Sequence, residues 1–139
     1  WVSKDITDDI ERETTATNIV ASRKGQGLFK ARVTSVERGC RVTGATGQRY
    51  LIASHIKPWS VSNNIEKLDG HNGLLLSPHI DRMFDKGYIS FSDDGALLIS
   101  KHCESNIIIA WGIKEMNTGS FKSEQKVYLD YHRSYIFKG

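Results

Sequence analysis

The chain has 139 residues, of which 39% are hydrophobic and 25% are charged, and these values suit a single globular domain with a modest core. No segment approaches the roughly 18 apolar residues of a membrane-spanning helix, and no signal-peptide pattern is present. We therefore expect a cytoplasmic protein with no membrane partner. The net charge of +3 is compatible with a nucleic-acid partner but does not single one out.

The first part of the chain predicts two helices. Residues 5–20 are polar with sparse apolar positions, and we expect residues 1–22 to be a linker helix from an upstream domain and residues 23–139 to form the folded domain. Apolar residues at helical spacing predict a second helix over residues 27–36, which Gly39 ends.

Short strands and a loop are predicted next. Residues 40–44 predict a short strand that enters a turn, and residues 49–54 predict a strand that ends before Pro58. Residues 61–70 are polar and contain two turn signals, so they predict a loop, and residues 73–76 predict a brief apolar strand.

A short helix and a hairpin follow. Ser77 is a suitable N-cap and is followed by a proline, which predicts a helix over residues 78–86 that Gly87 ends. Residues 88–91 and 96–99 flank an Asp-Asp-Gly sequence and predict a β-hairpin.

The remaining apolar segments complete an α+β protein. Residues 107–111 suit either a strand or a helix, and residues 127–137 predict a C-terminal helix with Leu129 and Ile136 facing inward. The centre of the fold is then a strand–loop–strand–helix unit.

This central unit carries side chains that suit phosphodiester hydrolysis. His55 ends an apolar strand and is the candidate general base, because the pKa of imidazole lies near working pH. Asn72 begins the second strand, where its amide can cross-link the loop before it. Asp81 and Asp85 are four residues apart on the predicted helix, so both carboxylates share one face and suit a hard cation such as Mg²⁺. His79 is the reserve ligand or a phosphate contact.

Each of these residues also has an ordinary structural explanation. A lone histidine such as His55 is more often structural than catalytic. Asp81 and Asp85 alone are more often solvated and paired with Arg82 or Lys86. The order of histidine, asparagine and two aspartates on these elements favours the catalytic interpretation over the structural one.

Three motifs resemble the HNH endonucleases with a ββα-metal fold. They are ASHIKPW at residues 53–59, NGLLLSP at residues 72–78 and DRMFDKG at residues 81–87. The resemblance extends upstream to residues 23–30 and downstream to residues 88–91. It implies an α+β fold in which a ββα-metal (HNH) nuclease core has flanking helices and an added β-hairpin.

The resemblance implies a role for each site residue. His55 is the catalytic base that activates water, and Asn72 braces the loop. Asp81 and Asp85, with His79 in reserve, bind one divalent metal ion. Mg²⁺ is the expected ion, and Mn²⁺ and Ni²⁺ are the alternatives.

Two features depart from the family pattern. Ser54 stands where many HNH enzymes place an aspartate or histidine ligand, and a hydroxyl is a weak ligand, so the inner metal shell is incomplete. Of the cysteine pairs that bind structural zinc in many relatives, only Cys40 is present, so no structural zinc is expected.

The resemblance also implies the partners. Double-stranded DNA is the expected substrate, cut to 5′-phosphate and 3′-hydroxyl ends, with phosphate contacts from Lys57, Arg82, Lys86, Arg23 and Lys24. Such nucleases often serve in restriction or defence with an upstream DNA-recognition domain, and double-strand cutting is compatible with a homodimer. Two other functions stay open: a non-catalytic DNA-binding module with a decayed HNH site, and a toxin-like nuclease with an inhibitor partner.

Overall fold

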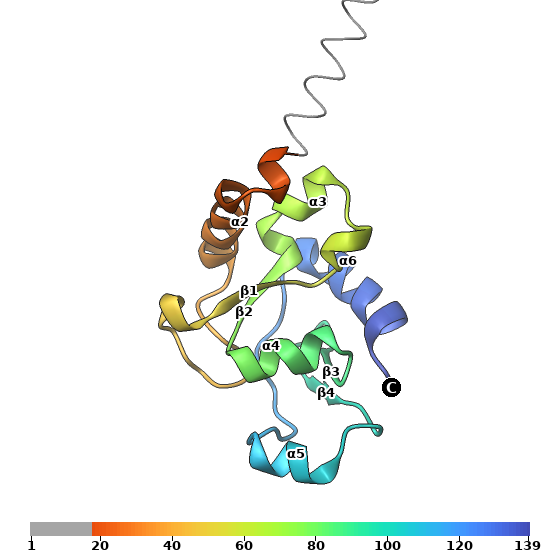
Figure 1. Ribbon diagram of the computed structural model, residues 1–139. Coiled ribbons are helices and arrows are strands. Elements are labelled where there is room, and N and C mark those ends of the chain that lie inside the picture. The colour runs from red at the N-terminus through yellow and green to blue at the C-terminus, as the bar shows by residue number, and fades with distance from the viewer. Residues whose placement is uncertain (1–17) are drawn as a thin grey trace, which may run out of the picture.

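The computed structural model describes residues 18–139, which form two small antiparallel sheets surrounded by helices (Figure 1). Residues 5–17 of the helix predicted over residues 5–20 lie outside the described residues. The division of the chain into a linker, residues 1–22, and a folded domain, residues 23–139, stays a prediction. No helix in the described part is long and apolar enough to cross a membrane. In chain order the elements are α2 (Arg23–Val36), β1 (Ile52–His55), α3 (Asn64–Leu68), β2 (Gly73–Leu76), α4 (Pro78–Asp85), β3 (Ile89–Phe91), β4 (Leu97–Ile99), α5 (Ser105–Ala110) and α6 (Ser123–Tyr131), with a final π-helical turn, η4 (His132–Ile136).

The sheet of β1 and β2 lies at the centre of the fold. The two strands are antiparallel, with Ile52 opposite Leu76 and His55 opposite Gly73. All four residues of β2 are buried, so both faces of this strand are covered, and α2 and α4 each contact both strands. The two strands and the final helix of the predicted strand–loop–strand–helix unit are confirmed, and α4 follows β2 after one residue.

Helix α2 begins four residues before the predicted start because Ser22 caps it. The Ser22 hydroxyl accepts a hydrogen bond from the Gly25 backbone N–H at 3.2 Å. The buried residues of the helix, Gly25, Phe29 and Val33, are four apart and form one stripe. This stripe is the face that α2 turns toward the central sheet.

The strand predicted over residues 40–44 is wrong, because these residues form a turn. The Gly44 N–H donates to the Cys40 carbonyl at 2.9 Å, and Gly44 has a φ of 79°. Arg41 lies inside the turn and donates to both carboxylate oxygens of Glu37, at 2.6 and 2.9 Å. Side-chain hydrogen bonds to Glu37, the residue that follows α2, therefore hold this segment in place of strand pairing.

The loop predicted over residues 61–70 is wrong in part, because it contains helix α3. Asn63 caps this helix: its side chain accepts from the Glu66 N–H at 2.8 Å, and the Glu66 carboxylate accepts from the Asn63 N–H at 2.9 Å. Residues 107–110, whose sequence suits either a strand or a helix, belong to helix α5. The C-terminal helix predicted over residues 127–137 is divided, because α6 ends at Tyr131 and His132–Ile136 form η4.

The second sheet, β3 with β4, is the predicted hairpin, and His132 joins it to the C-terminal segment. The His132 ring is buried, stacks on the Phe84 ring at 3.8 Å and donates from Nε2 to the Phe84 carbonyl at 2.9 Å. Its Nδ1 therefore accepts from the Ser90 hydroxyl, at 2.8 Å. Burial lowers the pKa of His132 to about 4, so the ring is neutral in the folded protein.

We predict that His132 makes the free energy of unfolding depend on pH. In the unfolded chain a histidine titrates near its ordinary pKa of about 6.5, whereas the folded protein holds the pKa of His132 at about 4. Because the pKa of His132 is lower in the folded protein than in the unfolded chain, neutral His132 stabilises the fold fully above pH 6.5. This contribution to the free energy of unfolding is lost as the pH falls toward 4, by up to about 3 kcal/mol.

Urea unfolding of the parent and of His132→Gln between pH 7.5 and 4.5 measures this contribution. The free energy of unfolding should fall less steeply with decreasing pH in the variant than in the parent. The same change at the exposed His102 is the matched control for the loss of an imidazole, and its slope is the one with which that of His132→Gln is compared. Equal slopes for the parent and His132→Gln would contradict the prediction.

Candidate active site

His55 is held at the end of β1 by one hydrogen bond and one ring stack. Its Nε2 lies 2.8 Å from the Lys67 carbonyl oxygen and donates to it. One face of the ring stacks on Phe29, with centroids 3.8 Å apart and planes 3° from parallel. Burial lowers the pKa of His55, and the Lys67 carbonyl opposes this only in part, so the ring is neutral at neutral pH.

The second ring nitrogen of His55 is available to a substrate. Nδ1 forms no hydrogen bond within residues 18–139, and every buried side-chain nitrogen or oxygen in this part of the chain has a partner, so water can reach Nδ1. Because Nε2 carries the proton, Nδ1 carries the lone pair. The geometry therefore presents a neutral imidazole with its basic nitrogen open.

Gly73 makes the stack of Phe29 on His55 possible. It lies opposite His55 in the sheet, on the side that faces α2. A Cβ atom on Gly73 would lie 2.7 Å from Cζ of Phe29 and would also collide with Val33. Because Gly73 has no side chain, the Phe29 ring can reach the His55 imidazole.

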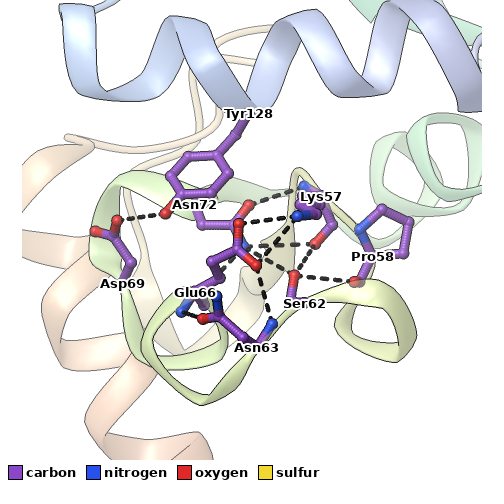
Figure 2. A network of polar contacts seen from close by, with 8 residues as sticks. All are labelled: Lys57, Pro58, Ser62, Asn63, Glu66, Asp69, Asn72 and Tyr128. Carbon is purple, nitrogen blue, oxygen red and sulfur yellow. Dashed lines mark hydrogen bonds and ion pairs between the residues drawn. The ribbon is translucent and has the colours of Figure 1, made fainter.

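Asn72 is fully buried and cross-links the chain between β1 and β2 (Figure 2). Its side-chain oxygen accepts from the Lys57 N–H at 2.8 Å, and its side-chain nitrogen donates to the Glu66 carbonyl at 3.0 Å. The same nitrogen lies 3.5 Å from the Ser62 hydroxyl. These are the contacts of a loop brace, and the role of Asn72 in catalysis stays a prediction.

A second set of polar contacts surrounds this brace (Figure 2). The Lys57 ammonium lies 2.9 and 3.1 Å from the two carboxylate oxygens of Glu66. The Tyr128 hydroxyl, from α6, donates to Asp69 at 2.6 Å. Burial of Asp69 opposes its ionisation, but the hydrogen bonds from Tyr128 and His71 outweigh it and lower the pKa of Asp69.

Most of these supporting residues were not predicted from the sequence. A signal existed for one of them, because Asn63 and Glu66 have the spacing of a capping box. No local pattern pointed to Phe29 or Tyr128, since both act across the tertiary structure.

The predicted metal ligands lie on α4 and do not form a complete site by themselves. Asp81 is half-buried, Asp85 is exposed, and neither carboxylate forms an ion pair or a side-chain hydrogen bond in the described part of the chain. His79 lies with its ring edge toward Trp111, at 6.0 Å. Within residues 18–139 no three His, Cys, Asp or Glu side chains are grouped so as to hold a metal.

Two carboxylates still fit a magnesium-class ion. Mg²⁺ keeps several water ligands and is usually bound through one or two carboxylates together with substrate phosphates. Asp81 and Asp85 are one helical turn apart and supply that number. Their assignment as ligands, and that of His79, stays a prediction.

The predicted phosphate contacts fall into two groups. Arg82 and Lys86 are exposed on α4, and Arg23 and Lys24 are exposed in the first turn of α2. Lys57 differs, because its ammonium is bound to Glu66. In this structure Lys57 is a cross-link of the loop, so a contact with phosphate would require it to leave Glu66.

A cleft of about 560 Å³ opens beside His55. Helix α2 lines it with Phe29 and Lys30, and the chain after β1 lines it with Trp59 and Lys67. The candidate base therefore lies in the wall of a recess large enough for part of a substrate.

The described residues thus form a small α+β fold with a braced, neutral histidine at the end of β1 and two carboxylates on α4. Residues 40–92 match the protein family described as HNH endonuclease. This segment, which contains His55, Asn72, Asp81 and Asp85, belongs to the HNH endonuclease family. No curated protein matches the chain. HNH nucleases act on DNA and typically use a divalent metal, so membership suggests nuclease activity.

We predict that Gly73→Ala destabilises the fold and displaces Phe29 from His55. The added methyl group would overlap Phe29 and Val33, and overpacking of this kind typically costs about 1–3 kcal/mol. Gly27→Ala is the matched control, because Gly27 lies in α2 with no atom within 4 Å of an added Cβ. That control should stabilise the helix by roughly 0.5–1 kcal/mol.

Urea unfolding gives both free energies, and the proton chemical shifts of the His55 ring report its stacking on Phe29. The chemical shifts of the His55 ring should differ from those of the parent in Gly73→Ala and match those of the parent in Gly27→Ala. Equal stability of the Gly73→Ala variant and the parent would show that the sheet has room for the methyl group.

Proposed function

We propose that this chain is a metal-dependent endonuclease that hydrolyses phosphodiester bonds in double-stranded DNA. The observation that carries the proposal is the state of His55: a neutral imidazole, braced through Nε2 and open at Nδ1. An open basic nitrogen at the edge of a cleft is what a general base needs in order to reach a bound substrate. Membership of residues 40–92 in the HNH endonuclease family supports the same function.

In this mechanism His55 acts as general base. A water molecule at Nδ1 gives up a proton to the ring as its oxygen attacks phosphorus, in line with the bond to the 3′ oxygen. The bond from phosphorus to the 3′ oxygen breaks, and the leaving 3′ oxygen takes up a proton from solvent water, which gives a 5′-phosphate and a 3′-hydroxyl. The Lys67 carbonyl then stabilises the imidazolium, because the proton on Nε2 already points to it.

Asp81 and Asp85 would hold the divalent ion, and Mg²⁺ is the proposed ion, with Mn²⁺ or Ni²⁺ as substitutes. Such an ion, when bound, neutralises charge on the scissile phosphate and on the leaving oxygen. Asn72 contributes by position: it holds the Glu66 carbonyl, one peptide unit before the Lys67 carbonyl that binds His55. A restriction or defence role is the biological setting that we propose for this activity.

A second candidate is a DNA-binding module that has lost catalysis. It is favoured by Ser54, a weak ligand next to the base, and by the lack of a three-ligand group among residues 18–139. Cleavage of supercoiled plasmid with Mg²⁺, Mn²⁺, Ni²⁺ or EDTA separates the two candidates. Metal-dependent nicking supports the endonuclease, and DNA binding without cleavage in any metal supports the module.

We predict that His55→Ala lowers the nicking rate by roughly 10²- to 10⁴-fold, the usual contribution of a positioned base. Asp81→Ala should remove the dependence on metal together with the activity. Asp94→Ala is the matched control, because Asp94 is exposed in the turn between β3 and β4, away from the residues assigned to the site. Nicking by His55→Ala at the parent rate would refute the assignment of the base.

We also predict the acidic limit of activity. The base must be neutral to accept a proton, and burial holds the pKa of His55 below its ordinary value of about 6.5. The value of kcat/KM should therefore rise with pH along a limb whose midpoint lies below 6.5, and then level off. Initial nicking rates at subsaturating DNA give this profile, and a midpoint above 6.5 would contradict the described environment of His55.

A further inference from the structure

We infer that the cleft beside His55 is a subsite for one unpaired nucleobase, which stacks on Trp59 next to the phosphate that is cut. This inference rests on the proposed endonuclease function and adds to it the form of DNA that the site takes. The ASHIKPW motif suggests that Trp59 anchors the chain after the base, yet its side chain is 45% exposed and lies in the wall of the cleft. A large exposed indole beside a candidate base has a face to offer to a ligand.

Lys67 fixes Trp59 relative to His55. Its backbone carbonyl accepts the hydrogen bond from His55 Nε2, and its ammonium lies 3.9 Å from the centre of the Trp59 ring. A cation over an indole is an attractive arrangement. One residue therefore contacts both the candidate base and the indole, which places the two beside the same cleft.

The charge of the cleft suits a nucleotide. Its lining includes Lys30, Lys67 and His55, and none of the described residues that line it is an aspartate or glutamate. The Lys30 ammonium is bound by the Gln48 and Leu51 carbonyls, at 2.8 Å each, and shapes the wall. Lys67 is then the cation that faces a phosphate adjoining the stacked base.

The size of the cleft and its exposed indole suit a base that has left the helix. Bases inside a duplex stack on one another, so an aromatic side chain reaches the face of a base only where that base is unstacked or displaced. The volume of about 560 Å³ lies in the range of roughly 300–1,000 Å³ that is usual for small-ligand sites, which leaves room for a base and its sugar. We therefore assign the cleft to a single displaced nucleotide and not to the paired duplex.

Binding without cleavage tests this assignment. Two fluorescent duplexes of the same sequence, one fully paired and one with a single unpaired base, are titrated with the protein in EDTA. The parent should bind the duplex with the unpaired base more tightly. Trp59→Ala should weaken that binding by roughly ten- to hundred-fold, the usual effect of losing a base–aromatic stack, and should change the paired duplex little.

Two variants serve as controls. Trp59→Phe retains a ring and should keep most of the preference. Tyr135→Ala removes an exposed aromatic side chain that does not line the cleft, and it should bind both duplexes like the parent. Thermal unfolding of each variant shows that the fold is intact.

The inference is overturned if Trp59→Ala binds the unpaired-base duplex as tightly as the parent does, or if it weakens both duplexes equally. Equal weakening would mean that Trp59 contacts the DNA backbone. The result is independent of the nuclease test, because no cleavage occurs in EDTA. Loss of the preference in Trp59→Ala, together with a parent that cuts no plasmid in any metal, would refute the endonuclease and leave the subsite standing.

Discussion

The buried amide of Asn72 is the constraint on which the candidate site depends. It binds the chain at Lys57, just after β1, and again at Glu66, inside α3. Each of these backbone groups would cost about 1–3 kcal/mol if it were buried without a partner, so the amide strongly favours one loop conformation. The carbonyl after that of Glu66 belongs to Lys67 and accepts the hydrogen bond from His55 Nε2. The hydrogen bond from Asn72 to the Glu66 carbonyl therefore helps to position the next carbonyl, that of Lys67, which holds the His55 imidazole.

The segment that matches the HNH endonuclease family does not hold this site together alone. The base and the amide lie within residues 40–92. The ring that stacks on His55 comes from Phe29 in α2, and the hydroxyl that binds Asp69 comes from Tyr128 in α6. Asp69 accepts the His71 N–H, and its carbonyl accepts the Asn72 N–H. Elements on both sides of the matched segment therefore support the turn that carries the amide.

The sequence predicts the parts of this protein that depend on local order, and misses those that depend on packing. Apolar runs bounded by glycine, proline and turn residues predict strand β2, helix α4 and the hairpin of β3 and β4, and these elements are confirmed. The strand predicted over residues 40–44 is wrong because a strand needs a partner, and Arg41 is bound to Glu37 instead. The stack of Phe29 on His55 depends on where α2 crosses the sheet, which no local pattern specifies.

The candidate base and the candidate metal ligands lie on different elements, and their chemistry suits this separation. A base needs a lone pair at working pH, and a cation site needs negative charge. A carboxylate close to an imidazole raises the pKa of the imidazole and favours the protonated form, which cannot accept a proton. Among the described residues no carboxylate acts on the pKa of His55, which burial lowers. Asp81 and Asp85, on α4, form no ion pair within residues 18–139, so their charge remains available for a cation while His55, on β1, stays neutral.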